Sequence, residues 1–331
     1  MSRPTLSDVA RACGVSPATV SKALNPHADR CDLAPATRDK VIAAARALGF
    51  RPSASHGKRT RRLWRNVGLV WGRFAPFTSG VYEGVLDIVG ERLVERGWRL
   101  FYTPVPDLAS WREMQMAQRL DGVLAVSHVP EPALEAFVAD GYPAVLLNLQ
   151  THLPLPQFLP DERGGMTALV THLAQLGHRE IIYLAHIDDG VGHFSERDRP
   201  VALAAAAVTH GMHVTTIIPR DYDRLVTLCR STATAVICYN WNDIPRVLET
   251  VRNAGLSIPG DVSVACCADL RWFAHLTPAV TAVDVPMNAL AVRALDELLA
   301  RIDGDASAPA EPVILPMVLR ARGSTGPVRA S

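Results

Sequence analysis

The sequence predicts a small all-α head followed by an α/β body of two doubly wound lobes. The 331 residues suffice for about two domains and a small extra module. Residues 1–65 carry 13 Lys and Arg against four Asp, a net charge of +9, whereas the remaining residues carry a net charge of −8. From residue 67 onward, short apolar runs alternate with longer amphipathic ones, which is typical of parallel-sheet α/β structure.

The composition argues for a soluble protein of the reducing cytoplasm. No apolar run approaches the roughly 18 to 20 residues that a membrane span requires, so we expect no membrane partner. The N-terminal stretch MSRPTLSDVARACG lacks the apolar core of a signal peptide, and the six cysteines lie mostly in apolar segments. The basic head suits a polyanionic partner, which the acidic body would repel.

Two short helices are predicted at the start of the head. Thr5 is a candidate N-cap for the first, whose apolar face is formed by Leu6, Val9 and Ala10 and which ends at Gly14. Ser16 and Pro17 then supply an N-cap and a first helical residue for the second helix. Its predicted apolar face comprises Val20, Ala23 and Leu24.

A third helix follows, predicted to begin at Pro35 and to end at Gly49. Its predicted buried stripe comprises Val41, Ile42, Ala45 and Leu48. Two helices joined by a short turn that contains Gly, with a third helix behind them, form the layout of a helix-turn-helix domain. In such domains the second helix enters the major groove of DNA.

Short or hydrogen-bonding side chains gather on and around the second helix, where they could reach bases or phosphates. The predicted DNA-binding residues of the helical region are Thr5, Leu6, Ser16, Pro17, Ala18, Thr19, Ser21, Lys22 and Asn25. The alternative is a three-helix scaffold with a merely solvated face. The charge of the head and the absence of Asp or Glu between Val9 and Ala28 favour DNA.

The stretches TLSDVARACGVSPATVSKALN and ATRDKVIAAARALGFRPS resemble the DNA-binding head of the lactose-repressor (LacI-type) family of bacterial transcription regulators. The family motif V-S-x-x-T-V-S is matched by Val15, Ser16, Thr19, Val20 and Ser21. The loop between the second and third helices is about three residues longer than usual, which is thermodynamically cheap.

A second departure from the family lies in the hinge that follows the head. The family places there a leucine that inserts into the minor groove, whereas this sequence has Arg59 within SASHGKRTRRLWR. Lys58 and Arg59 favour phosphates or a narrow minor groove over the unstacking of a base step. Both are therefore predicted DNA contacts.

Eight buried strands and six helices are predicted in the body. The strands cover 67–71, 100–104, 122–127, 144–149, 181–185, 214–218, 235–239 and 262–266. The helices lie near 79–97, 107–119, 131–140, 162–176, 198–211 and 243–254. Ligands of such folds bind at the carboxyl ends of the strands, so two facing lobes would form a cleft.

The body also resembles the family, and with it the periplasmic sugar-binding proteins. The stretches that carry this resemblance are 161–186, 251–270 and 276–286. The resemblance implies a periplasmic-binding-protein-like body and a homodimer, whose two heads would select a pseudo-palindromic site on double-stranded DNA.

The resemblance also implies a small-molecule effector in the cleft. Of the polar clamps that family members use for sugar hydroxyls, Arg199 is retained, whereas Asn240-Trp241 and the stretch from Cys266 to Asp269 depart from the pattern. The side chains of Trp71, Phe77, Tyr239 and Trp241 are predicted to form flat apolar walls of the cleft. These walls and Arg199 favour an anionic or aromatic effector, and the alternative is that the cleft binds no effector. The predicted effector-binding residues are Phe77, Asp161, Arg199, Asn240, Trp241 and Asp269.

Two other groups of residues are candidates for chemical sites. His186, Asp188, Asp189 and His193 are metal-ligand types, but their uneven spacing in a loop favours a solvated segment. The pair Cys266-Cys267 fits two small core residues better than a redox pair. No nucleophile elbow, phosphate loop or dinucleotide fingerprint occurs, so we expect neither an enzyme nor a cofactor, and no metal.

The sequence thus predicts a homodimeric, sequence-specific DNA-binding regulator, in the form of a repressor that responds to a small molecule. The expected organisation is a DNA-binding domain over 1–51, a hinge over 52–65 and an effector-binding and dimerisation domain over 66–331. The alternatives are a regulator with a vestigial cleft and constitutive DNA binding, a soluble ligand-binding protein, and an enzyme.

Overall fold

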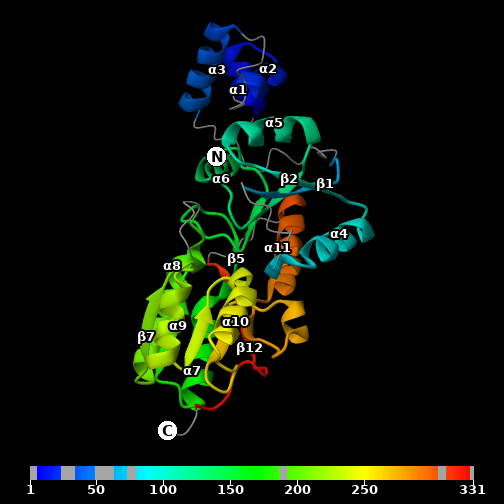
Figure 1. Ribbon diagram of the computed structural model, residues 1–331. Coiled ribbons are helices and arrows are strands. Elements are labelled where there is room, and N and C mark those ends of the chain that lie inside the picture. The colour runs from blue at the N-terminus through cyan, green and yellow to red at the C-terminus, as the bar shows by residue number, and fades with distance from the viewer. Residues whose placement is uncertain are drawn as a thin grey trace. The chain divides into compact units, whose positions relative to one another are not determined.

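The computed structural model describes residues 6–23, 34–48, 63–72, 80–186, 192–304 and 311–328. Contacts divide the chain into two compact units, a head (Met1–Leu63) and a body (Trp64–Ser331) (Figure 1). Among the described residues no helix is long and apolar enough to cross a membrane.

The head contains the three predicted helices, α1 (Leu6–Cys13), α2 (Pro17–Ala23) and α3 (Pro35–Ala47). Gly14 has a left-handed backbone (φ 66°), which ends α1, and the Thr19 amide donates to Ser16 Oγ at 3.1 Å, which caps α2. The core of the head consists of Val9, Ala10, Cys13, Val20, Ala23, Val41 and Ala45.

One residue of the predicted stripe of the third helix was placed wrongly. Leu48 is 41% exposed, because α3 ends at Ala47 and Leu48 belongs to the turn that follows. Thr5, Leu24 and Gly49 lie outside the described residues.

Lobe 1 of the body is a six-stranded sheet of order β11-β5-β4-β3-β1-β2, in which every pairing is parallel. Its strands are β1 (Asn66–Trp71), β2 (Arg99–Pro104), β3 (Gly122–Val126), β4 (Ala144–Leu147), β5 (Gln157–Asp161) and β11 (Val313–Pro316). Helices α4 (Val85–Glu95) and α11 (Met287–Ile302) cover one face. Helices α5 (Leu108–Gln118) and α6 (Glu131–Ala139) cover the other. A 3-10 turn, η3 (Gly80–Tyr82), precedes α4.

Lobe 2 is a second six-stranded sheet, of order β12-β10-β9-β8-β6-β7, in which only the β10–β12 pairing is antiparallel. Its strands are β6 (Glu180–Leu184), β7 (His213–Ile217), β8 (Ala235–Cys238), β9 (Ser263–Cys266), β10 (Thr281–Asp284) and β12 (Val318–Arg320). Helices α7 (Glu162–Gln175) and α8 (Phe194–Thr209) pack on one face and α9 (Tyr222–Ser231) and α10 (Ile244–Asn253) on the other. Two 3-10 turns, η4 (Trp241–Asp243) and η5 (Arg271–His275), follow β8 and β9.

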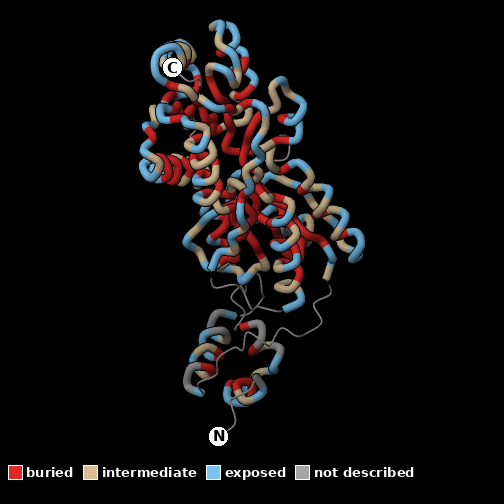
Figure 2. Tube along the Cα trace, turned by 90° about the horizontal axis from the view of Figure 1, so that it is seen from below, coloured by how far each residue is buried: buried red, intermediate tan, exposed pale blue. Residues whose placement is uncertain are grey.

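The chain passes between the lobes three times: from β5 into α7, from β10 into α11 and from β11 into β12. The residues of each strand alternate between the two faces of its sheet, as Ile181 and Ile182 do in β6. Buried residues accordingly concentrate along the two sheets (Figure 2). Cys238, Cys266 and Cys267 are fully buried among them, as core residues.

The predicted fold class is confirmed, and all eight predicted strands are present with ends within two residues. Two predicted helix starts were wrong: α4 begins at Val85 rather than near 79, after a 3-10 turn, and α8 begins at Phe194 rather than 198, because His193 caps it. The elements β5, α9, β10, α11, β11 and β12 were not predicted.

Candidate functional site

In the head, the described part of the predicted DNA-binding surface is the turn before α2 and α2 itself. Ser16 and Pro17 are exposed, Thr19 is half-buried, and Ser16 Oγ lies 2.9 Å from Thr19 Oγ1. Ala18, Ser21 and Lys22 lie within α2, and Leu6 is the first residue of α1. Thr5, Asn25, Lys58 and Arg59 lie outside the described residues.

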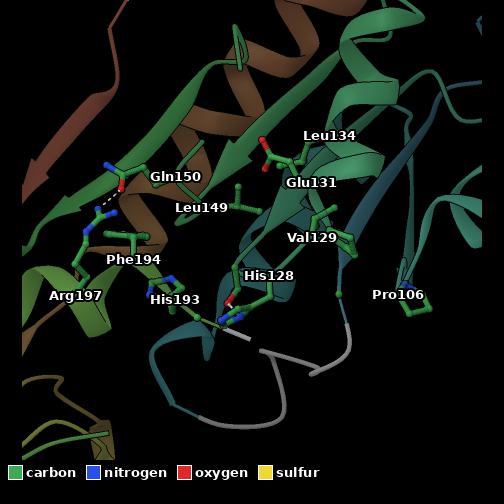
Figure 3. A pocket seen from close by; sticks show the side chains of 14 residues that line it. Pro106, His128, Val129, Glu131, Leu134, Leu149, Gln150, His193, Phe194 and Arg197 are labelled. Carbon is green, nitrogen blue, oxygen red and sulfur yellow. Dashed lines mark hydrogen bonds between the residues drawn. The ribbon is translucent and has the colours of Figure 1, made fainter. Parts of the chain in front are cut away.

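In the body, a pocket of about 590 Å³ is lined by both lobes (Figure 3). Lobe 1 supplies residues that follow β1, β3 and β4, and the start of α6, whereas lobe 2 supplies the first turn of α8. The lining comprises Gly72, Pro106, Ser127, His128, Val129, Pro130, Glu131, Leu134, Leu149, Gln150, Gly192, His193, Phe194 and Arg197. We call it the inter-lobe pocket.

A close backbone contact shapes the lobe 1 side of the inter-lobe pocket. Gly72 directly follows β1, and a Cβ atom at this position would collide with the backbone carbonyl of His128. Ser127, beside His128, has a left-handed backbone (φ 58°), and its Oγ lies 2.7 Å from His128 Nδ1. Such conformations are uncommon for residues with a side chain and occur at functional sites.

Polar side chains join the two lobes beside this pocket. His193 Nε2 lies 3.0 Å from the backbone carbonyl of Asn148, which directly follows β4. Arg197 donates to Gln150 Oε1 at 2.7 Å, as the dashed line in Figure 3 shows. Figure 3 also places His193 next to His128, whose ring centroid is 5.2 Å away.

Arg199 does not line the inter-lobe pocket, because it is buried and bound to a carboxylate of its own lobe. Its guanidinium donates to both carboxylate oxygens of Glu162, at 2.7 and 2.8 Å. Burial alone would lower the pKa of Arg199, but the charge of Glu162 and the hydrogen bonds to it outweigh burial and raise this pKa.

Asp269 lies elsewhere, at a second pocket of about 470 Å³, beside the passage from β10 into α11. It accepts two hydrogen bonds from Arg322, at 2.8 and 2.6 Å. The side-chain hydrogen bonds to Asp269 raise the pKa of Arg322. The second pocket also includes Gly80 and Val81, from the turn before α4.

The other predicted effector residues perform local structural tasks. Asp161 caps α7 by accepting from the Gly164 amide at 2.9 Å, and Asn240 accepts from the Asn242 amide at 2.9 Å. Trp241 packs its indole against Gly80, and its Nε1 is buried with no hydrogen-bond partner among the described residues. Phe77 lies outside the described residues.

None of the five predicted effector residues that the structure describes lines the inter-lobe pocket, and other residues, which sequence reasoning missed, come together there. These are His128, Glu131, Gln150, Phe194 and Arg197, with His193, which had been considered only as a metal ligand. Three of the six, His128, Glu131 and Gln150, could have been found, since they follow predicted strands or begin a predicted helix, where ligands of α/β folds bind. Among the described residues no group of His, Cys, Asp or Glu could hold a metal ion, and Asp188 and Asp189 lie outside them.

Comparisons with known proteins address both units. A family model described as "Bacterial regulatory proteins, lacI family" matches residues 5–53, and one described as "Periplasmic binding protein-like domain" matches residues 170–325. Both matches agree with the resemblance that the motifs indicated.

The similar proteins span nearly the whole chain. The HTH-type transcriptional regulator MalR of Streptomyces coelicolor is 28% identical, over 97% of this chain and 96% of the relative. The HTH-type transcriptional repressor PurR of Photobacterium profundum is 26% identical, over 90% of this chain and 92% of the relative. A solved complex of the transcriptional regulator CelR with cellobiose is 27% identical, covers 97% of this chain and 100% of that one, and has a TM-score of 0.65. With its helix-turn-helix head, its two-lobed body and these full-length likenesses, the chain combines a LacI-family DNA-binding head with a periplasmic-binding-protein-like body, as in bacterial transcriptional regulators of that family.

Proposed function

We propose that this regulator is a repressor whose affinity for a pseudo-palindromic operator changes when a small molecule binds in the inter-lobe pocket. The observation that carries the proposal is that both lobes line this pocket. A ligand that contacts both lobes binds differently to different lobe arrangements, and only such a difference can shift an equilibrium between them. Coupling of this kind typically amounts to about 1 to 3 kcal/mol, which is roughly 5- to 150-fold in affinity.

The DNA-binding part of the proposal assigns base and phosphate contacts to α2 and its flanks. Ser16, Pro17, Ala18, Ser21 and Lys22 are assigned to the operator, with Thr5, Leu6, Thr19 and Asn25 in support and Lys58 and Arg59 in the hinge. The match of the family model to residues 5–53 supports this assignment. A homodimer is proposed with it, since two heads one helical turn apart would read the two half-sites.

The proposed organisation keeps the boundaries 1–51, 52–65 and 66–331. The relatives are named as regulators, which supports a regulatory rather than an enzymatic chain working in the bacterial cytoplasm. The repressor role is supported by the name of the PurR relative.

The chemical class of the effector is proposed from the residues that line the inter-lobe pocket. Arg199 and Asp269 are held in ion pairs, so hydroxyl groups of a neutral sugar would have to compete with Glu162 and Arg322. The inter-lobe pocket instead presents an aromatic ring, Phe194, near a guanidinium, Arg197. This supports an aromatic or anionic effector, whereas the CelR relative was solved with cellobiose.

A second candidate is a regulator that binds its operator constitutively. The observation that favours it is the same pair of internal ion pairs, because they engage two of the predicted effector-binding residues, Arg199 and Asp269. In this case no small molecule would alter operator affinity.

The test begins with selection of bound duplexes from a random pool by the full-length protein at a stated salt concentration. A pseudo-palindrome is expected, and its absence would contradict the DNA-binding proposal. Affinity for the selected duplex is then measured with cellobiose, with sugar acids and with aromatic carboxylates. A change of fivefold or more with one of them supports the effector proposal, and no change with any supports constitutive binding.

A further inference from the structure

His193 joins the two lobes through a partly buried hydrogen bond. It is the N-cap of α8 in lobe 2, and its Nε2 lies 3.0 Å from the backbone carbonyl of Asn148 in lobe 1. Its other ring nitrogen, Nδ1, lies 2.7 Å from Ser195 Oγ, and Ser195 Oγ lies 2.8 Å from the hydroxyl of Tyr239. These groups form a continuous path from the end of β8 in lobe 2 to the end of β4 in lobe 1.

The chemistry of the groups sets the direction of each hydrogen bond. Desolvation lowers the pKa of His193 to about 3, so the imidazole is neutral and carries one N–H. A carbonyl can only accept, so Nε2–H donates to Asn148 and Nδ1 accepts from the Ser195 hydroxyl. Ser195 in turn accepts from Tyr239. No donor along this path lacks an acceptor.

On the lobe 1 side the path continues into the interior. Asn148 has a left-handed backbone (φ 52°), and its side-chain amide donates to the hydroxyl of Tyr82 at 2.5 Å. Both residues are buried. The carbonyl group that accepts from His193 therefore belongs to a residue, Asn148, whose side chain is itself held by a hydrogen bond.

The second polar contact between the lobes differs in environment. Arg197 donates to Gln150 on the surface, and the Arg197 side chain is 68% exposed. Exposed contacts of this kind contribute little, because water and salt screen them. The His193 contact is partly buried, so its donor and acceptor are less accessible to water when it breaks, and it favours the observed arrangement of the lobes more than the Arg197 contact does.

We propose that His193 positions the two lobes against each other with no ligand bound, by donating its Nε2–H to the Asn148 carbonyl. Because His193 also lines the inter-lobe pocket, a molecule that enters the pocket meets the hydrogen bond that joins the lobes. The claim that this hydrogen bond affects operator affinity rests on the proposed function. The claim that it positions the two lobes does not.

A plain helix-capping role is the competing explanation. His193 Nδ1 also lies 3.3 Å from the Ser195 amide, and the His193 amide donates to Glu196 Oε1 at 3.0 Å, which completes a capping box. Two substitutions separate the roles. Asn is among the best N-cap residues but too short to reach Asn148, whereas the Gln amide nitrogen can take the place of Nε2 but Gln is a poor N-cap.

The experiment compares His193→Asn and His193→Gln with the unaltered full-length protein by amide hydrogen exchange, without DNA or ligand. The proposal expects exchange around residues 148–151 to accelerate about tenfold in His193→Asn and to stay near the unaltered rate in His193→Gln. Unaltered exchange in His193→Asn, or equal acceleration in both variants, would overturn the proposal. Acceleration in His193→Gln alone would assign only a capping role.

A second variant covers the case in which His193→Asn fails to fold. His193→Gly removes the ring, and added imidazole can refill the space, since Gly costs an N-cap position only a few tenths of a kcal/mol. Imidazole should return exchange around 148–151 to the unaltered rate, and failure to do so would overturn the proposal. Operator affinity of the same variants is measured in parallel. If the unaltered protein selects no DNA sequence, the proposed function fails while the exchange result stands.

Discussion

Arg199 and Glu162 bind each other through two parallel hydrogen bonds of 2.7 and 2.8 Å, and their side chains are only 7% and 5% exposed. Glu162 is the first residue of α7, directly after the chain leaves lobe 1, and Arg199 lies in the second turn of α8. The pair therefore ties together the two helices that cover one face of the lobe 2 sheet. A bidentate geometry of this kind is specific to Arg and carboxylate groups.

Replacing one partner of this pair should destabilise the protein strongly. Arg199→Met leaves the Glu162 carboxylate buried and unpaired, which typically costs about 3 to 5 kcal/mol in the free energy of unfolding. The double variant Arg199→Met/Glu162→Gln removes both charges and should recover most of that loss. Urea unfolding of the three proteins measures the difference.

The same comparison bears on the sequence-based prediction that Arg199 is required for the ligand response. An unstable Arg199 variant would lose the response for a trivial reason, so the double variant is the one to test for it. If Arg199→Met reduces the free energy of unfolding by less than about 1 kcal/mol, the buried ion pair contributes little to stability.

Gly80 and Trp241 make the second close contact that a substitution can probe. Gly80 precedes α4 in lobe 1, and a Cβ atom there would lie 2.5 and 2.7 Å from the indole of Trp241 in lobe 2. Gly80→Ala should therefore reduce the free energy of unfolding by about 1 to 3 kcal/mol through overpacking, in addition to the cost of its left-handed backbone. Urea unfolding measures the loss.

Gly211→Ala is the matched control, because Gly211 has a similar φ of 62° and nothing within 4 Å of the added atom. Gly211→Ala should reduce the free energy of unfolding by only about 1 kcal/mol, which is the cost of a left-handed backbone at a residue with a side chain. Adding Trp241→Phe to Gly80→Ala should restore part of the stability, because the smaller ring vacates the space. If Gly80→Ala and Gly211→Ala lose the same amount, the Trp241 contact is not responsible.

The sequence predicts those elements of the body whose pattern is local. The strand Gly122–Val126 is a run of apolar residues that are all buried. It can be recognised as a buried strand without knowing which elements pack on either face of the sheet. The helix Met287–Ile302 also has a complete apolar stripe, although it was not among the predicted helices. By contrast, Gln157–Asp161 contains Pro160, which weakens the strand signal, and Val318–Arg320 is too short to show a period.

The roles of the candidate site residues were harder to predict, because these residues acquire their roles through tertiary contacts. Arg199 is separated from Glu162 by 37 positions, and nothing in either local sequence shows that they meet. His193 illustrates the same limit: its place before a helix is visible in the sequence, but the carbonyl it binds lies 45 positions away. The head was easier, since capping by Ser16 depends only on a residue three positions along.

Lys22→Ala should weaken operator binding. Lys22 lies in α2, the helix assigned to the major groove, and loss of one charge-assisted contact should lower affinity about tenfold. If the contact is to phosphate, the slope of log K against log salt should also fall by about one. Titration of the selected duplex at several salt concentrations measures both quantities.

Lys40→Ala removes the same charge from α3, where Lys40 is exposed, and serves as the control for the overall charge of the head. Its affinity should fall less than that of Lys22→Ala. Equal losses would mean that the head is held by general electrostatic attraction rather than by α2 in the groove.

Stability should fall below neutral pH through His193. The pKa of this imidazole is about 3 in the folded protein because of burial, with His128, Arg199 and His186 also lowering it, against about 6.5 in the unfolded chain. As pH falls, the imidazole is therefore protonated in the unfolded chain before it is protonated in the folded protein. The stabilising contribution of neutral His193 to the free energy of unfolding is thus complete above about pH 6.5 and is lost toward pH 3. At pH 5 this loss amounts to about 2 kcal/mol.

His193→Gln isolates this contribution, because Gln does not titrate while the other histidines remain. Between pH 8 and pH 5 the unaltered protein should lose about 2 kcal/mol more than the variant in the free energy of unfolding, as measured with urea. His172 and His178, whose pKa values burial also lowers, contribute equally to both proteins and cancel in the difference. Equal losses in the two proteins would mean that the imidazole accepts a proton without unfolding the body, and thus that the His193–Asn148 contact opens freely in solution.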